Sequence, residues 1–489
     1  MKLKNLTVLS QEEIQEIHEA SLEILESCGV RILSASMLSF LKRKGLNVEA
    51  DKQLARFPRG TVEDALGTVP ERFEVFGRDG AFAFTLGDGV PRIAAGHNAV
   101  FWYDSESGQT RESTVADVAR FSRICQALEC IDMIGIPVMP QDVPDPRSTL
   151  LYGVKAVVEN SDKPIYFSTD NCRANHACVE LLRATFSGDL KEQVYGICQL
   201  SSTAPLYWEQ GVLDAFFDTV MMGVPISLLP EPIAGISAPY TLAGLLTVSN
   251  AEALSGIVML QLLKKGAKLM YGNSWTTTDM SSGAALVGST ETTICRIAAA
   301  QLAKFYRIPS HTTAPNSDNH EHDEQNAWEK TLSQFCAVAS GHDLIVNCGM
   351  FATGLTCSDE QLVMDEEISA MSKRIAAGIR VDRDTIAADV IKRIGAKGDS
   401  YLTDEHTMKW LYSDEYLRPR VSVRGPRAAW VAAGGKDTYA LARDKARELA
   451  NTTRGRLDEK RAARLREIIK HFEGATGKMD NSAQVESRK

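Results

Sequence analysis

The 489-residue sequence has no CxxC pair among its ten cysteines and contains only nine histidines. Zinc ribbons and thioredoxin-type sites are therefore excluded, because both need cysteines paired at that spacing. The sequence also lacks GxxxxGK[ST], GxGxxG after a strand, HExxH and GxSxG. These absences remove support for phosphate-loop, Rossmann-type nicotinamide, zincin and nucleophile-elbow chemistry.

The composition is that of an ordinary globular protein, with 44% hydrophobic and 24% charged residues. This excludes a disordered or collagen-like chain. The net charge of −9 argues against a broad nucleic-acid interface. The most apolar stretch, residues 242–263, is interrupted by Asn250, Glu252 and Gln261, which favours a buried helix over a membrane span. Residues 1–9 show no apolar signal region, and we expect a cytoplasmic protein with reduced cysteines.

From about residue 115 onward, short apolar runs alternate with longer helical patterns. The spacing of the runs is roughly that of one βα unit. Apolar rather than alternating strands are typical of a parallel sheet that is covered on both faces. The pattern predicts an α/β protein with a (β/α)8 TIM-type barrel. We expect strands at 131–138, 164–168, 194–200, 225–229, 267–271, 308–312 and 343–347, and an eighth strand near 99–103 or after 370.

The sequence predicts four segments. Residues 1–112 form an N-terminal accessory region with a helix and a small sheet, in which Ser10 and Glu13 make a capping box and Gly29 ends the helix. Residues 113–400 form the barrel. Residues 401–475 form a C-terminal helical extension, and residues 476–489 a polar tail.

In such a barrel, functional residues follow the C-terminal ends of the strands. Those positions hold amides, small residues and aromatics, and few clustered carboxylates or histidines. This inventory suits binding more than acid–base hydrolysis, and aromatic faces can hold a quaternary ammonium. The candidates are Glu231, Asn273, Trp275, Asn316 and Phe351.

Three features have two interpretations each. Glu231 lies between two prolines and either meets a cation or a proton, or serves as a cap or a surface group. His97 is either a structural histidine or a ligand contact. The His320–Asp323 cluster is either a zinc site, which would need a further ligand, or a polar loop that leads into a helix.

Several motifs, in their order along the chain, resemble the signature of the trimethylamine methyltransferase (MttB) family. Ser317 and Asp318 are one such pair, and Glu329 follows at the family's position. The resemblance runs from the N-terminal helix to about residue 430. The other matching segments are 235–244, 250–258, 266–272, 288–291, 323–325 and 358–368.

The resemblance implies a barrel that moves a methyl group from an amine to the cobalt of a separate corrinoid protein. Founding members carry pyrrolysine directly before the Ser-Asp pair, whereas this sequence has Asn316 there. In this respect it is similar to the non-pyrrolysine branch, whose members demethylate quaternary amines. Glycine betaine is our leading substrate, with proline betaine, carnitine and γ-butyrobetaine as the other options.

We therefore expect a quaternary amine:corrinoid methyltransferase that acts in one-carbon metabolism. Asn316 and Glu231 are the predicted catalytic residues, and Glu329 is expected to hold the loop. We expect no tightly bound cofactor and no metal, a corrinoid (cobalamin) partner protein as acceptor, no nucleic-acid or membrane partner, and a homo-oligomer. A non-catalytic betaine-binding relative is the first alternative, and a metal-dependent lyase or hydrolase the second. The predicted substrate-binding residues are His97, Asn273, Trp275 and Phe351.

Overall fold

The computed structural model describes residues 1–169, 171–452 and 457–474. Its centre is a closed barrel of eight strands, and every neighbouring pair in it is parallel. The predicted polar tail, 476–489, lies outside the described residues. The barrel strands are β6 (Arg92–Ala95), β9 (Met133–Ile134), β10 (Ile165–Ser168), β11 (Gly196–Leu200), β13 (Ile226–Leu228), β14 (Leu269–Asn273), β17 (Ser310–Thr313) and β18 (Leu344–Cys348).

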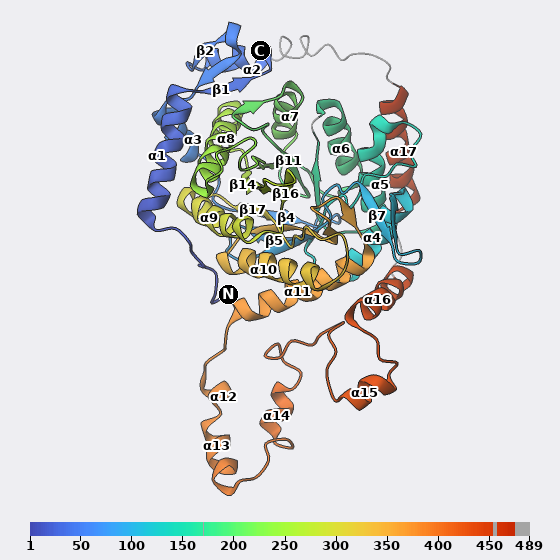
Figure 1. The fold of residues 1–489 in the computed structure, drawn as a ribbon. Helices are drawn as coiled ribbons and strands as arrows, with labels where there is room; N and C mark the ends of the chain where they lie inside the picture. The colour runs from blue at the N-terminus through green and yellow to red at the C-terminus, as the bar shows by residue number, and fades with distance from the viewer. Residues whose placement is uncertain (170, 453–456, 475–489) are drawn as a thin grey trace.

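One long helix follows each barrel strand and packs on the outside of the barrel (Figure 1). The predicted (β/α)8 architecture is therefore confirmed. The barrel helices are α4 (Val115–Ala127), α5 (Thr149–Asn160), α6 (Cys172–Thr185), α7 (Gln210–Met221), α8 (Leu242–Leu263), α9 (Thr290–Tyr306), α10 (Glu324–Ser340) and α11 (Asp359–Ala377).

All seven strands predicted from apolar runs are barrel strands, but the prediction of the eighth is wrong. The eighth strand is β6, which precedes the predicted segment at 99–103. That segment instead overlaps β7 (Phe101–Asp104), which belongs to a small sheet with β8 (Gln109–Glu112), β19 (Met350–Phe351) and β20 (Thr356–Cys357). The predicted limits of the barrel also differ from the structure, because β6 lies before residue 113 and α11 ends at Ala377.

The N-terminal region wraps one side and one end of the barrel. The helix α1 (Gln11–Ser27) begins with the predicted Ser10–Glu13 capping box. A hairpin of β4 (Phe73–Phe76) and β5 (Phe82–Leu86) sends apolar side chains into the barrel interior, where they share a core with strand residues such as Met133 and Ile197. The other elements here are β1 (Val30–Ile32), α2 (Ala35–Arg43), β2 (Asn47–Glu49), β3 (Leu54–Arg56) and α3 (Arg59–Leu66).

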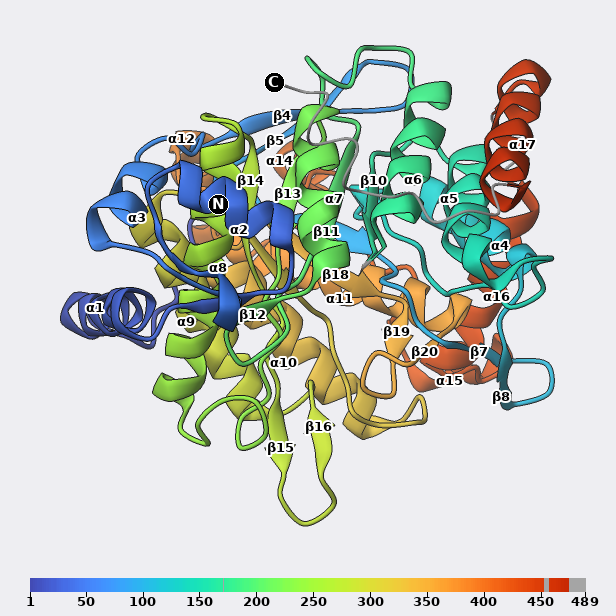
Figure 2. The same cartoon turned by 90° about the horizontal axis from the view of Figure 1, so that it is seen from above.

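Further elements extend the barrel at its rim and at its C-terminal side. Two short strands, β15 (Thr277–Asp279) and β16 (Ala284–Leu286), form a projecting hairpin (Figure 2). β12 (Tyr207–Trp208) joins β1 of the N-terminal sheet. After α11 come α12 (Arg383–Ile386), α13 (Ala388–Ile394), α14 (Glu405–Trp410), α15 (Arg427–Ala432), α16 (Thr438–Thr452) and α17 (Glu459–Gly474).

Helix α8 is, among the described helices, the one long and apolar enough to cross a membrane. Most of its side chains are buried inside the protein, including the polar groups Asn250 and Glu252. Glu252 accepts hydrogen bonds from the Ser202 hydroxyl at 2.6 Å and the Leu206 amide at 2.7 Å. The prediction of a buried helix at 242–263 is therefore confirmed.

Candidate functional site

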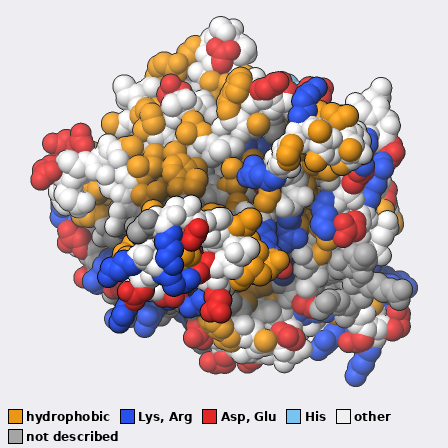
Figure 3. Space-filling model, turned by 90° about the horizontal axis from the view of Figure 1, so that it is seen from below, with side chains coloured by type: hydrophobic (Ala, Val, Ile, Leu, Met, Phe, Trp, Pro, Cys, Tyr) orange, Lys and Arg blue, Asp and Glu red, His pale blue; other side chains and the backbone are white. Residues whose placement is uncertain are grey.

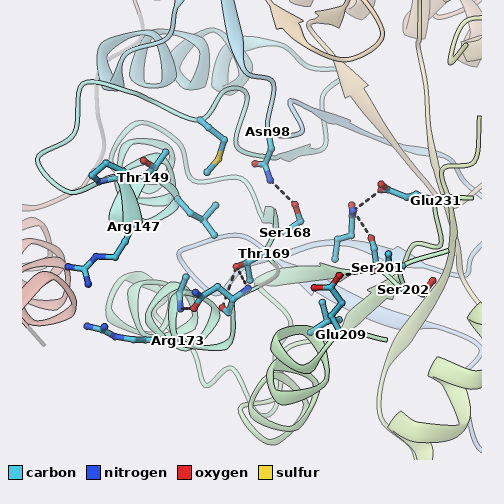
Figure 4. Close-up of a pocket in the computed structure, with 18 of the residues that line it drawn as sticks. Asn98, Arg147, Thr149, Ser168, Thr169, Arg173, Ser201, Ser202, Glu209 and Glu231 are labelled. Atoms are coloured by element: carbon cyan, nitrogen blue, oxygen red, sulfur yellow. Dashed lines mark hydrogen bonds between the residues drawn. The ribbon is translucent and has the colours of Figure 1, made fainter. Parts of the chain in front are cut away.

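A cavity of about 620 Å³ opens at the C-terminal mouth of the barrel. One wall comes from residues at or just after the ends of β6, β10, β11 and β13. The opposite wall comes from the start of α5, the start of α6 and the end of α17 (Figure 4). The hairpin β4–β5 fills the other end of the barrel, so access to the interior is from this mouth. The residues that line the cavity include Asn98, Ser168, Gln199, Ser201, Glu231, Arg147, Arg173 and Phe472.

Glu231 lines this cavity from the loop after β13, together with Glu209, Arg147 and Arg173 (Figure 4). Its side chain is exposed to the cavity, and desolvation by the surrounding protein raises the pKa of its carboxyl to about 7. Gln199 donates to Glu231 Oε1 at 3.4 Å and to Ser201 Oγ at 3.3 Å. Among the described residues, no basic side chain forms an ion pair with Glu231. A cation in the cavity would therefore meet an uncompensated carboxylate.

Beneath Glu231, a polar chain crosses the barrel interior. The Tyr166 hydroxyl donates to Gln199 Oε1 at 2.5 Å, and it lies 3.3 Å from His311 Nδ1. His311 Nδ1 also lies 2.9 Å from Ser227 Oγ. Burial, reinforced by the neighbouring His97 and His342, holds the pKa of His311 well below its ordinary value. His311 is therefore a neutral imidazole that helps to orient Gln199 through Tyr166.

A second chain brings together two of the predicted residues, His97 and Asn316. His97 Nδ1 lies 3.2 Å from Asn347 Oδ1, and Asn347 donates from Nδ2 to Asn316 Oδ1 at 2.8 Å. Asn347 has φ +124°, a backbone conformation that residues other than glycine rarely adopt. The surrounding structure must therefore hold Asn347 in place. The His97 ring also packs edge-on against Tyr166 at 5.6 Å between centroids, so the two chains meet. Burial lowers the pKa of His97.

Of the predicted residues, Glu231 lines the cavity, and the others, His97 and Asn316 included, lie outside its lining. Asn273 is buried, and its side-chain amide bonds to β17. Its Nδ2 donates to His311 O at 3.0 Å, and its Oδ1 accepts from Thr312 Oγ1 at 2.8 Å. Trp275 is buried in the loop after β14. Phe351 is buried against Tyr103 and His322, with ring centroids 6.0 and 4.5 Å away. The structure does not bring these three side chains to Glu231.

Sequence reasoning missed several cavity residues. Gln199 is a polar residue among apolar neighbours in β11, which is a signal that its side chain points into the barrel. His311 lies beneath it and outside the cavity lining, in β17, whose other residues are serine and threonine, so no such contrast marks it. Phe472 is the one aromatic among the lining residues, and it comes from α17 near the end of the described chain. Arg173 lies over the Phe472 ring at 4.4 Å, which fixes this wall. No local pattern connects Phe472 with strand ends that precede it by hundreds of residues.

The loop that carries Asn316 is anchored from below. Ser317 donates to Glu329 Oε2 at 2.8 Å, and the Asp318 amide donates to the same oxygen at 2.9 Å. The predicted role of Glu329 in holding this loop is confirmed. Lys330, fully buried, donates to Pro315 O at 3.2 Å and to Asp365 Oδ2 at 2.8 Å. The loop position is therefore set by two successive residues of α10.

The His320–Asp323 segment has the polar-loop arrangement. His320 is exposed, and Asp323 caps α10 by accepting from the Gln325 and Asn326 amides. His322 instead packs among Tyr103, Phe351 and Tyr439. No group of three or more His, Cys, Asp or Glu side chains in the described part of the chain is placed to hold a metal ion.

The closed barrel has the fold of a solved methylamine methyltransferase. The monomethylamine methyltransferase MtmB of Methanosarcina barkeri superposes with a TM-score of 0.53 at 14% identity, covering 92% of this chain and 89% of that chain. The hydroxylamine complex of MtmB gives 0.54 at 13% identity with the same coverage. At these identities the likeness concerns the fold.

The sequence comparison is more specific. The family described as trimethylamine methyltransferase (MTTB) matches residues 1–476, and the chain belongs to that family. The trimethylamine methyltransferase MttB of Desulfitobacterium hafniense (strain DSM 10664 / DCB-2) is 31% identical over 96% of this chain and 95% of its own length. A glycine betaine methyltransferase of D. hafniense (strain Y51) is 29% identical over 88% of this chain and 89% of its own length. The protein is a methyltransferase.

Proposed function

We propose that the protein removes a methyl group from a quaternary amine, with glycine betaine as the leading substrate, and passes it to the cobalt of a corrinoid held by a partner protein. The observation that carries this proposal is the Glu231 carboxylate, which faces the cavity with no basic partner among the described residues. The name of the glycine betaine methyltransferase relative supports the same substrate class.

A quaternary ammonium suits this cavity because it has no N–H to donate. It is held by charge and by contact with polarisable surfaces rather than by directed hydrogen bonds. Glu231 supplies the charge, and Phe472 supplies an aromatic wall. The amine leaves as a neutral tertiary amine, so the leaving nitrogen needs no proton. This agrees with a site in which burial keeps the neighbouring His311 and His97 neutral.

The far end of a betaine carries a carboxylate, and the cavity offers hydroxyl and amide donors for it. Ser201 accepts from Gln199, and its own proton has no acceptor among the described residues. Ser168 accepts from Asn98 at 2.7 Å and stands on the same wall (Figure 4). In this proposal, Ser201 and Ser168 orient the carboxylate while Glu231 attracts the trimethylammonium head. Such anchoring at both ends holds the reacting methyl group in one orientation.

The corrinoid supplies a cobalt nucleophile when its carrier protein docks. The residues of this chain then have the task of presenting the methyl group at the mouth and excluding water. We propose the loops at the C-terminal mouth as the docking face, because the cavity opens there. We also propose a cytoplasmic location. All ten cysteines are free thiols in the structure, which agrees with a reducing compartment.

The direct test is methyl transfer to a reduced corrinoid protein from a panel of glycine betaine, proline betaine, carnitine, γ-butyrobetaine and trimethylamine. We expect the cobalt spectrum to change to that of the methylated form with one or a few quaternary amines, and not with trimethylamine. Stabilisation by a betaine without demethylated product would support the non-catalytic relative. No response to any quaternary amine would refute the proposal.

An Asn316→Ala variant is expected to reduce kcat by a factor of roughly 10 to 100, the effect of losing one or two oriented hydrogen bonds, about 1.4–2.7 kcal/mol. Because Asn316 is buried and its side chain bonds to Thr313 O and Asn347, the thermal midpoint should fall as well, while the protein stays folded at the assay temperature. The matched control is Asn319→Ala, which removes an amide of the same loop that bonds to Asp323 instead. Initial rates of cobalt methylation measure the effect. Equal rates for wild type and Asn316→Ala would remove Asn316 from the site.

A further inference from the structure

Residues 379–435, which we call the arm, project from the end of α11 away from the barrel (Figure 1). The arm contains α12, α13, α14 and α15, none longer than seven residues. Helices this short are not stable in water without tertiary contacts. Among the described side chains of the arm, only Ile394 and Val421 are buried. The arm therefore lacks a core of its own.

The arm is instead rich in exposed apolar side chains. Of the 29 large hydrophobic side chains that are exposed in the described residues, 13 lie in these 57 positions. Leu402, Tyr412 and Tyr416 expose 72–75% of their surface. If each side chain exposes about 100 Å² of apolar surface, the 13 together expose about 1,000 Å². Monomeric proteins rarely expose so much apolar surface in one region.

In the described part of the chain, the arm is hydrogen-bonded to the rest of the protein at its root, where Lys2 Nζ donates to Ile379 O, and along residues 415–422. The Glu367 carboxylate accepts from the Arg420 amide at 2.7 Å and from the Ser422 hydroxyl at 2.5 Å. Arg374 donates to Glu415 O at 3.0 and 2.8 Å. The more distant part is held by pairs within itself, such as Arg393 with Asp404. These contacts fix the direction in which the arm leaves the barrel and leave its apolar side chains uncovered.

A second apolar surface lies beside the root of the arm, on the outer face of α11. Met364, Ile368, Met371 and Ile375 follow one another at helical spacings of four, three and four, while other residues of α11 pack on β18 and against α10 and α16. Met364 and Ile368 are half-buried. Met371 and Ile375 are exposed. We call these four residues the stripe. Trp328 and Leu332 continue the exposed apolar surface onto the neighbouring α10.

We propose that two copies of this chain associate through these surfaces, with the arm of each copy packed on the stripe of the other. Both surfaces belong to one chain and lie on one side of the molecule, where Figure 3 shows hydrophobic side chains gathered. A two-fold interface pairs such surfaces reciprocally. The apolar area of the arm is comparable with the roughly 800 Å² that each partner contributes to a stable interface.

Charge and position favour a second copy over another protein. The arm carries ten Lys and Arg against eight Asp and Glu, in a chain of net charge −9, so it does not repel a second copy. The arm and the stripe lie at α10 and α11, whereas the cavity is walled by α5, α6 and α17 on another side of the barrel (Figure 1). A protein that must reach the cavity has no need to cover the arm.

Sedimentation of the full chain tests the interface, and we expect an even-numbered oligomer at micromolar concentration. A double arm variant, Leu402→Asp with Tyr412→Asp, and a double stripe variant, Met371→Asp with Ile375→Asp, should each sediment with half the wild-type number of subunits or fewer. The control is Phe82→Asp on the β4–β5 hairpin, which should keep the wild-type state; Phe82 is 58% exposed, within the 38–75% of the four substituted side chains. Circular dichroism checks that each variant is folded, and single substitutions replace any pair that is not.

Mixing separates arm-on-stripe packing from other arrangements. A mixed dimer of arm variant and stripe variant keeps one intact arm on one intact stripe, so the mixture should recover part of the dimer that neither variant forms alone. A monomeric wild-type protein overturns the proposal. So does a mixture of folded variants that stays monomeric, because the intact arm and the intact stripe then do not bind each other.

Discussion

A Glu231→Gln variant is expected to lose a factor of roughly 30 to 1,000 in kcat/KM for a quaternary amine. The substitution keeps the size of the side chain and its bond to Gln199, but it removes the negative charge that faces the cavity. Deleting one partner of a desolvated charge pair costs about 2–4 kcal/mol, which corresponds to that range. Transfer rates at several substrate concentrations measure it.

The matched control is Glu209→Gln. Glu209 also lines the cavity, at the start of α7, and its carboxylate is exposed. Its neutralisation should leave kcat/KM within a few-fold of wild type. If both variants lose activity equally, a general negative potential rather than Glu231 attracts the substrate. If neither does, Glu231 is not the counter-charge.

The same carboxyl gives the reaction a pH dependence of known sign. Its pKa of about 7 means that about one-tenth of the free protein is ionised at pH 6, and only that form attracts the cation. The apparent Kd should therefore weaken about tenfold between pH 8 and pH 6. Binding of the cation lowers the pKa of the carboxyl, so a proton is released near pH 7. Calorimetry in buffers of different ionisation enthalpy measures that proton, and Glu231→Gln should abolish it.

Without ligand, raising the pH has the opposite effect on the stability of the fold from its effect on substrate binding. Ionising a carboxyl whose pKa is raised in the folded protein destabilises that state as pH rises from about 4.5 through 7. Glu231→Gln should therefore be the more thermostable protein at pH 8. This gain together with lost activity is the signature of a group kept for function rather than for folding.

A Lys330→Met variant is expected to lose about 3–5 kcal/mol in free energy of unfolding. Lys330 and Asp365 are both fully buried and 2.8 Å apart, so removing the ammonium leaves a buried carboxylate without its counter-charge. Burial already raises the pKa of Asp365, with Lys330 opposing that shift. The defect should consequently be larger at pH 8 than at pH 5, because acid favours the neutral carboxyl, which needs no counter-charge. Urea titrations at the two pH values measure it.

The double variant Lys330→Met with Asp365→Asn provides the control, because it removes both charges. It should recover most of the lost stability. It should not recover full activity, since Lys330 also donates to Pro315 O and Asp365 accepts from the Gly349 amide, which position the loops after β17 and β18. A double variant as unstable as the single one would show that the ion pair is not the cause.

The sequence predicts the barrel well where the strands are long apolar runs, and less well where the barrel closes. Strand β6 follows a glycine-rich turn, and its apolar stretch is short and made mostly of alanine, so it lacks the larger apolar residues that mark most of the other strands. It becomes a barrel strand because β18 and β9 pair with it from far along the chain. Such pairing depends on the closure of the whole sheet, and no local pattern records it.

The site divides in the same way. Glu231 could be predicted as a cavity residue because it follows a strand end. His97 and Asn316 follow strand ends too, but the structure places them outside the cavity lining, where Asn347 joins them. The contribution of Tyr166 and Gln199 depends on which side chains of buried strands point inward, and apolar runs without alternation do not reveal this. The aromatic residues proposed for the substrate, Trp275 and Phe351, lie in buried contacts beside the barrel mouth, while Phe472 of α17 lines the cavity.

The position of Phe472 has a consequence for the order of synthesis. On a ribosome, the barrel can close once β18 has emerged, because its pairing with β6 completes the ring. The aromatic wall of the cavity is still missing then, since α17 is made last among the described elements. A newly made chain thus acquires its fold before its substrate pocket, and a tag or fusion placed behind α17 lies at the part of the site that is finished last.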